Sequence, residues 1–439
     1  LWAPRFGFNY TPTEDRSFQV RGGTGIFTGR VPFVWLSNQF TNTGTMFGTV
    51  FQNNPDRFIT DVEEQRNAGA SNSTVEVNVV SEDFKLPQVW RSNLAVDYTL
   101  PGEIVATVEG IYSKTLNDVV YRNLNLAAPV GTLPGVDNRE VYPSSTSARR
   151  INNDYTNVIL LDNTNKGYRY SVTGQLRKNF INGLNTSIAY TYGKAKDVNS
   201  GTSSTALSNW EYNQIVNNPN NPALEYSRFD VRHRIVGTTG YTFRYANNFA
   251  TSVSLFYEGQ SGMPFTYLYS QDLNNDGNRG NDLMYVPRDR SEINLVDLES
   301  RGVVTATADE QWEALDAFIE ADEYLKSRRG QYTERNGARM PWTHQFDLRL
   351  LQDFYLEGNG KKHTFQITFD VFNVGNLINK DWGRQYFVSN SANELLRYAG
   401  RDKVTNEPTF TFNPSSRAYN ISQFASRWQG QLGLRYIFN

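Results

Sequence analysis

The chain has 439 residues, of which 38% are hydrophobic and 14% aromatic, and its mean hydropathy is −0.56. A net charge of −2 does not indicate nucleic-acid binding, and the absence of cysteine excludes disulfides, thiolate metal sites and cysteine nucleophiles. A helical membrane protein is also excluded, because no run approaches the roughly 20 apolar residues that a spanning helix needs. No linker or shift in charge divides the chain, so we expect a single architecture.

In about eleven segments, apolar or aromatic residues alternate with charged or amide-bearing ones, which predicts β-strands. In one of them, Tyr170 and Val172 fall on one face while Arg169 and Thr173 fall on the other. In chain order the strands are predicted near residues 3 to 10, 17 to 29, 86 to 100, 103 to 114, 167 to 179, 184 to 194, 229 to 244, 249 to 259, 342 to 355, 363 to 374 and 428 to 438.

A period of two alone does not distinguish a membrane barrel from a soluble sandwich or barrel. The lengths of the links between the strands do. Short links, at residues 11 to 16, 101 to 102, 180 to 183, 246 to 248 and 357 to 362, alternate with long ones, at 31 to 85, 115 to 166, 195 to 228, 259 to 341 and 375 to 427. Tight periplasmic turns and long outer loops are typical of outer-membrane barrels. We therefore predict an all-β chain that forms an antiparallel transmembrane β-barrel with long extracellular loops, the longest being residues 260–340.

An odd number of strands places the two ends of the chain on opposite sides of the membrane, with Leu1 outside and the carboxyl end in the periplasm. Eleven strands alone would leave two unpaired backbone edges in hydrocarbon, which a membrane barrel does not tolerate. Leu1 follows no initiator methionine or signal peptide, so the chain is expected to be part of a longer precursor. Eleven is half of the 22 strands of plugged outer-membrane transporters, so residues 1–439 are predicted to form the carboxyl-terminal half of such a barrel, without its plug and first half.

Several stretches resemble the carboxyl-terminal half of a TonB-dependent outer-membrane receptor, closest to the Oar-like group common in Bacteroidetes. The resemblance is carried by residues 3–10 (APRFGFNY), 20–33 (VRGGTGIFTGRVPF), 272–282 (DLNNDGNRGND), 335–342 (RNGARMPW) and 369–373 (FDVFN). In the final strand, Gln431, Gly433, Tyr436 and Phe438 look like the signal that the barrel assembly machinery reads, although here the aromatic residue is followed by Asn439.

The resemblance implies transport of a large solute across the bacterial outer membrane, as import or less often export, driven by the TonB, ExbB and ExbD complex of the inner membrane. The partners expected from the resemblance are outer-membrane lipid, the missing barrel half and plug, and a surface lipoprotein. No cofactor is expected to be required. A passive, adhesive or structural barrel and a protein-export component remain the alternatives. An enzyme is not expected, because the three histidines, at 233, 344 and 363, lie far apart and each fits a strand.

The parity of the strands assigns each residue to a face. Predicted to face the lumen or the plug are Arg5, Arg21, Arg91, Asp97, Glu109, Arg169, Arg177, Asp230, Arg232, Arg234, Asp347, Arg349, Asp370 and Arg435. Such mixed charges suit a wall that holds a polar plug rather than a pore selective for one sign, although an ordinary solvated strand face would carry them equally well. Predicted to face lipid are Phe18, Val20, Leu94, Val96, Ile104, Val108, Ile188, Tyr190, Val253, Leu255, Phe346, Leu348, Ile367, Phe369, Leu432 and Leu434.

One loop segment carries a candidate metal site. Its side chains follow the spacing D-x-[DN]-x-[DN]-G, in which alternate oxygens converge on a hard cation: Asp272, Asn274, Asp276, Asn278 and Asp282, with Gly277 at the turn. Position twelve of a full calcium loop would be glutamate and is Leu283 here, so Asp282 and water would have to replace it. The alternative to calcium is a turn whose side chains cap their own backbone.

Two further loop segments have recognisable patterns. Residues Ala308 to Lys326 are predicted to form an amphipathic helix that docks on the outer loops, or else binds a partner. The loop from Val31 to Lys85 carries aromatic and methionine side chains that either meet a ligand or pack the loop into a cap: Phe33, Trp35, Phe40, Met46, Phe47 and Phe51.

Overall fold

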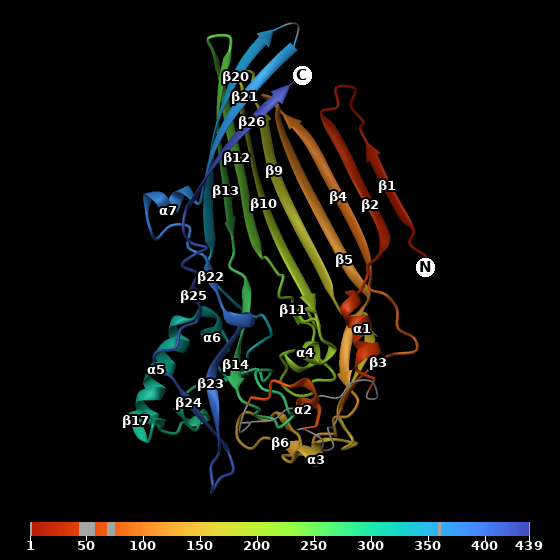
Figure 1. The fold of residues 1–439 in the computed structure, drawn as a ribbon, viewed down its shortest axis with the longest axis vertical. Coiled ribbons are helices and arrows are strands. Elements are labelled where there is room, and N and C mark those ends of the chain that lie inside the picture. The colour runs from red at the N-terminus through yellow and green to blue at the C-terminus, as the bar shows by residue number, and fades with distance from the viewer. Residues whose placement is uncertain (1, 44–57, 68–74, 359–360, 439) are drawn as a thin grey trace.

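The computed structural model describes residues 2–43, 58–67, 75–358 and 361–438, which form a sheet of long strands and an assembly of loops (Figure 1). The loops gather at one end of the strands, and the tight turns lie at the other end. Residues 1, 44–57, 68–74, 359–360 and 439 are outside this description, so the predictions for Met46, Phe47 and Phe51 fall outside it too.

Eleven long strands form the sheet, and each pairs antiparallel with the strands before and after it in the path. They are β1 (Arg5–Tyr10), β2 (Phe18–Thr28), β4 (Gln88–Leu100), β5 (Ile104–Asn123), β9 (Tyr168–Asn179), β10 (Leu184–Asp197), β12 (His233–Tyr245), β13 (Phe249–Gln260), β20 (Thr343–Gly358), β21 (Lys361–Phe372) and β26 (Gln429–Phe438). This confirms the prediction of an all-β chain with about eleven antiparallel strands.

Two strand boundaries differ from the sequence prediction. β5 continues to Asn123 because, beyond the main sheet, its last residues pair with β8 (Tyr155–Thr164), which in turn pairs parallel with β3 (Val75–Val80). β12 begins at His233 rather than near Phe229, because Asp230 does not join the backbone ladder: its side chain accepts from the N–H of Ala195 in β10, and its carbonyl accepts from Arg339. The alternating pattern extends past the point where strand pairing stops.

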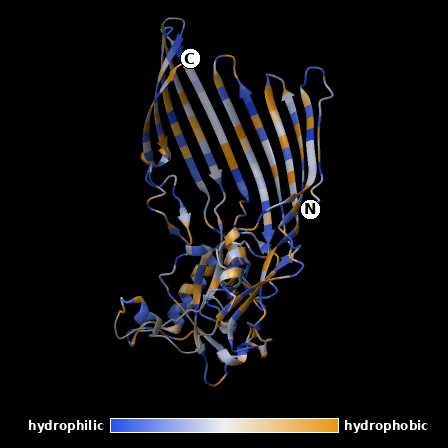
Figure 2. Cartoon of the chain, turned by 45° about the vertical axis from the view of Figure 1, so that its right-hand side comes forward, coloured by the Kyte–Doolittle hydropathy of each residue, from blue (hydrophilic) through white to orange (hydrophobic). Residues whose placement is uncertain are grey.

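The register keeps residues of one kind on one face. Val20 lies opposite Val96, which lies opposite Val108, while the adjacent row joins Arg21, Ala95 and Glu109. The resulting bands of apolar and polar residues cross the strands in Figure 2. We call these the apolar face and the polar face of the sheet. Among the described residues, no helix is long and apolar enough to cross a membrane.

The sheet ends in two strands that have one neighbour each. β1 pairs with β2 and β26 pairs with β21, and within the described part of the chain no strand covers the other edge of either. The described short links confirm the predicted turns; in the three-residue link between β12 and β13, Ala246 and Asn247 have φ of 49° and 59°, in the left-handed region that tight hairpin loops require.

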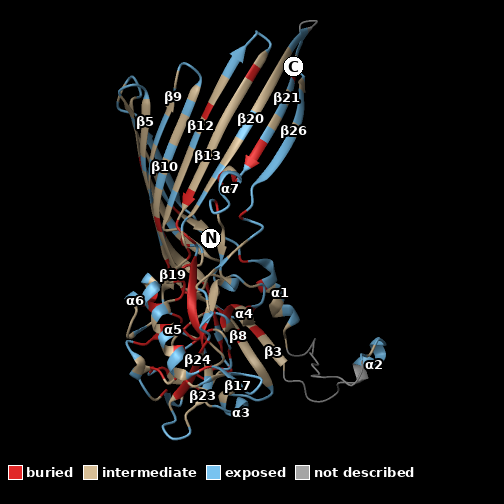
Figure 3. Ribbon diagram, turned by 90° about the vertical axis from the view of Figure 1, so that its left-hand side faces the viewer, coloured by how far each residue is buried: buried red, intermediate tan, exposed pale blue. Residues whose placement is uncertain are grey.

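The loop assembly has its own core, which holds most of the buried residues in Figure 3. A four-stranded sheet lies at its centre, in the order β19 (Ala338–Arg339), β14 (Pro264–Ser270), β23 (Ala392–Arg401) and β24 (Pro408–Phe412). The smaller elements are α1 (Phe33–Thr41), α2 (Val62–Asn67), β6 (Gly131–Thr132), β7 (Glu140–Val141), α3 (Thr146–Arg149), α4 (Ala206–Glu211), β11 (Glu225–Tyr226), β15 (Tyr285–Val286), η1 (Arg290–Glu292), β16 (Leu298–Ser300), β17 (Val303–Ala306), β18 (Gln331–Tyr332), α7 (Val374–Ile378), β22 (Tyr386–Phe387), η2 (Ser389–Ser391) and β25 (Asn420–Ile421).

The amphipathic segment 308–326 forms two helices, α5 (Ala308–Ala321) and α6 (Glu323–Ser327). Thr307 and Glu310 cap the start of α5 reciprocally, and Asp322 both ends α5 and caps α6. Leu315 and Ile319 of α5 are fully buried in the core of the loop assembly, so the structure shows docking of the helix on the loops.

The aromatic residues described in the loop from Val31 divide between core and surface. Trp35 of α1 is buried against Tyr121, and its indole N–H donates to the carbonyl of Ser203 at 2.8 Å. Phe33 and Phe40 are each 75% exposed. Only part of this loop therefore packs as a cap.

Candidate functional site

Stacked aromatic rings form a row across the apolar face, near the end of the strands where the loops gather. His233 stacks on Tyr190 and Trp342, and His344 stacks on Trp342 and Tyr257. Rings with one polar edge and one apolar body concentrate where hydrocarbon meets water. A second group of rings lies toward the tight turns and includes contacts among Tyr245, Phe249, Phe354, Phe365 and Tyr436.

Each of the three histidines pairs with a tyrosine hydroxyl across neighbouring strands. His233 Nδ1 is 2.7 Å from the Tyr190 hydroxyl, and His344 Nδ1 is 2.8 Å from that of Tyr257. His363 Nδ1 is 2.6 Å from the hydroxyl of Tyr436. The histidines lie in β12, β20 and β21, as the sequence pattern predicted.

The distance between the two aromatic groups fits a bilayer. His344 and Phe354 lie at opposite ends of the apolar face of β20, a separation of about 33 Å along the strand at roughly 3.3 Å per residue. A strand tilted by about 40° spans about 25 Å of membrane with that length, which is the height of the apolar band of outer-membrane barrels. All the residues predicted to face lipid are half-buried or exposed, so none belongs to a packed protein core.

The polar face carries ion pairs between strands. Arg21 Nε lies 3.0 Å from Asp97 Oδ2, and its Nη1 lies 3.4 Å from Glu109 Oε1. Farther along the sheet, Arg349 contacts Asp370 through two hydrogen bonds, of 2.5 and 3.1 Å. Arg234 pairs with Glu258 at 2.6 Å. Charges of both signs thus lie on this face, and several of them form ion pairs between strands.

Asp230 joins the sheet to the loop assembly. It is 1% exposed, accepts a hydrogen bond from the backbone N–H of Ala195 at 2.5 Å and forms an ion pair with Arg339. Arg232 and Arg339 also lie over the ring of Tyr226, at 4.9 and 5.9 Å from its centre. Asp230 and Arg232 were predicted within a strand, whereas the structure places both just before β12.

A fully buried guanidinium lies inside the loop assembly. Arg139 bonds to Asp137 Oδ1 and Asp282 Oδ1, both at 2.8 Å, and to the carbonyl of Leu283. It also lies over the ring of Tyr269, 5.1 Å from its centre. Two carboxylates, a carbonyl and an aromatic face therefore compensate one desolvated charge.

The turn from Asp272 to Asp282 folds around its own backbone. Asp272 Oδ2 accepts a hydrogen bond from the N–H of Gly277 at 2.9 Å, Asn274 Oδ1 accepts one from Asp276, and Asp276 Oδ1 accepts one from Asn278. Burial raises the pKa of Asp272 to about 6, with the nearby carboxylate of Asp282 as the second cause. Burial also raises the pKa of Asp276 above its ordinary value, and Asp282 and Asp272 add to that shift.

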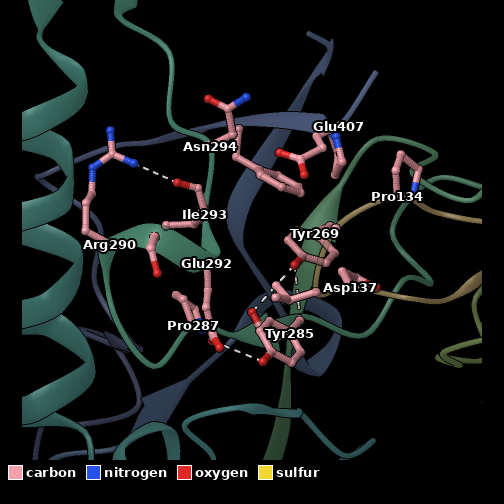
Figure 4. A pocket seen from close by; sticks show the side chains of 15 residues that line it. Pro134, Asp137, Tyr269, Tyr285, Pro287, Arg290, Glu292, Ile293, Asn294 and Glu407 are labelled. Carbon is pink, nitrogen blue, oxygen red and sulfur yellow. Dashed lines mark hydrogen bonds between the residues drawn. The ribbon is translucent and has the colours of Figure 1, made fainter. Parts of the chain in front are cut away.

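A cavity of about 410 Å³ opens beside Arg139 in the loop assembly (Figure 4). Tyr269 and Tyr285 form one side of it, and the hydroxyl of Tyr285 donates to Glu292 at 3.1 Å. Arg290 and Glu407 also line the cavity, but the guanidinium of Arg290 donates to the carbonyl of Ile293 at 2.6 Å. The lining is a mixture of rings and polar groups, most of which already bond to one another.

Comparison with known sequences assigns the family. The family described as "Outer membrane beta barrel domain" matches residues 1–393, which is most of the chain. The chain belongs to this outer-membrane β-barrel family. Its location is therefore the outer membrane, and the two faces of the sheet are those of a barrel wall. No curated protein matches the sequence.

Solved structures that resemble this outer-membrane barrel include several transporters and receptors. The outer membrane transporter YddB from Escherichia coli has a TM-score of 0.43 and 10% identity, over 100% of this chain and 40% of its own. A ferric enterobactin receptor (PfeA) from Pseudomonas aeruginosa has a TM-score of 0.38 and 11% identity, over 85% and 35%. The siderophore receptor PirA from Acinetobacter baumannii has a TM-score of 0.38 and 11% identity, over 86% and 37%. The chain thus spans 40% of the length of YddB, 35% of that of PfeA and 37% of that of PirA.

The structure distributes the predicted site residues of this outer-membrane barrel over three places. Arg169, Arg177, Arg234, Asp347, Arg349 and Asp370 lie in the long strands, Asp230 and Arg232 lie at the junction with the loops, and Gln431, Gly433, Tyr436 and Phe438 lie in β26. Asp272, Asn274, Asp276 and Asn278 stay together in one turn, whereas Asp282 turns toward Arg139. Whether these residues hold a plug, the assembly machinery or an ion stays a prediction.

Sequence reasoning missed the arginines that fasten the loops of the barrel. Arg139 was not singled out, because nothing in its local sequence indicates full burial. Arg335, with a side chain 3% exposed, pairs with Asp197 at 2.9 Å, and Arg339 pairs with Asp230. Both lie in the stretch 335–342, which carried part of the family resemblance. The resemblance pointed to this stretch, but the sequence did not indicate that its arginines form ion pairs with distant residues.

Proposed function

We propose that this chain is the carboxyl-terminal half of a 22-stranded barrel of the TonB-dependent, Oar-like type, which transports a large solute across the outer membrane. The observation that carries the proposal is the wide, unclosed sheet, in which no strand of the described residues pairs with the outer edge of β1 or β26. Hydrocarbon offers such edges no hydrogen-bond partners, so a second wall of similar width is needed to close the barrel. A closed barrel of about 22 strands has a lumen wide enough for a folded plug.

The polar face supports a plugged lumen rather than an open, charge-selective pore. It carries both signs of charge, some of them paired across strands as in Arg21 with Asp97 and Arg349 with Asp370, and such a surface is suited to hydrogen bonds with a polar domain. A plug blocks passive flow, so passage of solute then needs energy from the inner membrane. TonB, ExbB and ExbD are the proposed source of that energy, and a surface lipoprotein is the proposed outer partner.

The orientation follows from the lengths of the links. In the proposed orientation the loop assembly lies outside the cell and the tight turns lie in the periplasm. The solute would therefore first meet the loop assembly and its cavity beside Tyr269 and Tyr285.

The proposal is tested by comparing what cells remove from a complex medium. Three strains are grown: the parent, one without the gene for this protein, and one without TonB. We expect at least one large solute that the parent depletes and that both mutants leave in the medium. A solute that only the strain lacking this protein leaves behind would indicate a passive barrel and contradict the proposal. Identical depletion by all three strains would favour the adhesive or structural alternative.

A further inference from the structure

The turn from Asp272 to Asp282 lies where three loops of the outer assembly meet. The backbone N–H of Tyr142 donates to the carbonyl of Asn274 at 2.8 Å, and Arg149 donates to that of Asn275 at 3.1 Å. On the other side, the N–H of Ile215 donates to the carbonyl of Asn281, and the carbonyl of Ile215 accepts from the N–H of Leu283, both at 2.9 Å. Whatever fixes this turn therefore fixes the loops that carry residues 131–150 and 206–217 as well.

The side chains of the turn leave buried oxygen atoms without hydrogen-bond donors. Asn281 is fully buried; its Nδ2 donates to Asp276 Oδ2 at 2.8 Å, but its Oδ1 has no partner. Both atoms belong to one small amide group, so the unpartnered Oδ1 lies within a few ångströms of the Asp276 carboxylate. Asp272 uses Oδ2 for the N–H of Gly277, whereas its buried Oδ1 lacks a partner.

A buried oxygen without a donor costs about 1–3 kcal/mol in a protein interior, and this turn contains two of them, Asp272 Oδ1 and Asn281 Oδ1. Tyr142, whose backbone N–H bonds to the turn, is 2% exposed, and its hydroxyl is also unpartnered. A cation with oxygen ligands would satisfy acceptors of this kind, whereas an additional packed side chain would not.

The charges around the turn do not balance. When all four carboxyl groups are ionised, as a bound cation would favour, Asp137, Asp272, Asp276 and Asp282 carry four negative charges, and Arg139 and Arg149 carry two positive ones. A small cavity beside the turn adds Arg150 and Glu211, which cancel each other. The excess of two negative charges, almost entirely away from water, equals the charge of one divalent cation.

The chemistry of the ligands favours calcium over other divalent ions. In the part of the chain that the structure describes, no three histidine or acidic side chains form a ready metal cage, so amide and backbone oxygens have to complete the shell. Calcium accepts six to eight oxygens of mixed type in flexible geometry, whereas magnesium requires a tight octahedron.

We propose that the turn binds one calcium ion through Asp272, Asp276 and Asn281, with further oxygens from the turn and from water, and that the ion ties the three loops together. Asp282 balances Arg139 instead of serving as a direct ligand. Of the predicted set, the proposed site keeps Asp272 and Asp276, replaces Asp282 by Asn281 and assigns no ligand role to the side chains of Asn274 and Asn278. The inference does not depend on the proposed transport, because ion binding by the loops is measured without any solute.

The test uses the full-length protein in detergent, stripped with a chelator and titrated with calcium chloride in a calorimeter. We expect one calcium ion per chain, with a dissociation constant in the range of about 1 mM or tighter that extracellular modules show. Magnesium at the same concentrations should bind at least roughly tenfold more weakly. Asp276→Asn should lower the calcium affinity by at least about tenfold, as loss of a charged ligand does.

The matched control is Asp309→Asn, which removes a carboxylate with a 93% exposed side chain from the same loop and should leave calcium binding unchanged. Because Asp276→Asn could also unfold the loops, the wild-type protein is in addition digested with a protease, with and without calcium. Calcium should slow the cleavage of all three loops by a common factor. Absence of calcium binding to the wild-type protein, equal affinity of Asp276→Asn, or unchanged cleavage of the loops would each overturn the proposal.

Discussion

Arg139 shows how one residue organises the loop assembly. Its guanidinium is completely buried, and it reaches Asp137 from its own loop and Asp282 from the longest loop at 2.8 Å each. A buried ion pair adds little net stability compared with a well-packed apolar pair, but removal of one member leaves the others uncompensated. The network therefore acts mainly as a device that selects one arrangement of the two loops.

We expect Arg139→Met to destabilise the loop assembly by about 3–5 kcal/mol, because two carboxylates would stay buried without their cation. The rate at which a protease cleaves the loops of the folded barrel measures this change. Arg417→Met, at an exposed arginine of the same assembly, should leave the rate unchanged. Equal rates for both variants would show that Arg139 is dispensable.

A second prediction for single residues concerns the cost of placing a charge on each face of the long strands. Ile188 lies on the apolar face of β10 opposite Gly237, which lies between the ring-bearing residues His233 and Tyr245 of β12, and Thr238 lies on the polar face of β12. Ile188→Arg should lower the free energy of unfolding in lipid vesicles by about 2–4 kcal/mol, because it places a charge near the midplane of the bilayer.

Thr238→Arg is the control, and its effect should stay within about 0.5 kcal/mol because its new charge faces the water-filled side. Urea titration of the reconstituted full-length protein gives both values. A larger cost for Thr238→Arg than for Ile188→Arg would reverse the assignment of the faces.

At the scale of elements, the strands and the loop assembly are stabilised in different ways. The long strands bury few side chains against protein, and lipid takes the place of a core on their apolar face. The loop assembly instead has an ordinary hydrophobic core, to which α5 contributes Leu315 and Ile319. The two regions should therefore respond separately to core mutations.

Leu315→Ala should destabilise the loop assembly by about 2–5 kcal/mol, because it leaves a cavity under α5. Proteolysis of the loops should accelerate, while the barrel should still insert into membranes and resist urea as the wild type does. Glu313→Ala, on the exposed side of the same helix, should change neither property. If Leu315→Ala also weakened the barrel in lipid, the two regions would form a single cooperative unit.

At the scale of the whole molecule, the unpaired edges of β1 and β26 dominate. Each presents a row of backbone donors and acceptors that hydrocarbon leaves unsatisfied, at several kcal/mol per group. Closure by a second wall removes both edges at once, and no substitution of side chains could have the same effect. The barrel is therefore expected to be stable only as a closed assembly.

We expect residues 1–439, produced alone and refolded in detergent, to give no compact band that resists dodecyl sulfate before heating. A longer protein with the proposed second wall should give such a band, because that wall would close the barrel and pair all strand edges. Gel electrophoresis with and without heating distinguishes the two results. A heat-modifiable band from the short chain at its own mass would show that eleven strands close by themselves.

The sequence by itself determined the number, order and faces of the long strands. The side chains of a spanning strand must face lipid and water alternately along its whole length. Neighbouring residues such as Arg169 and Tyr170 therefore show the period of two directly in the sequence. The short links were equally local, because tight turns depend on a few neighbouring residues. The amphipathic pattern of α5 was readable for the same reason.

Only the tertiary structure decided how the loops meet. The pairing of Arg139 with Asp282, of Arg335 with Asp197 and of Arg339 with Asp230 joins residues more than 100 positions apart. The part played by Asn281 beside Asp276 and the release of Asp230 from β12 depend on the same assembly. Such contacts produce no periodic pattern in the sequence. They depend on how distant loops pack against one another, and the conformation of a single segment does not determine them.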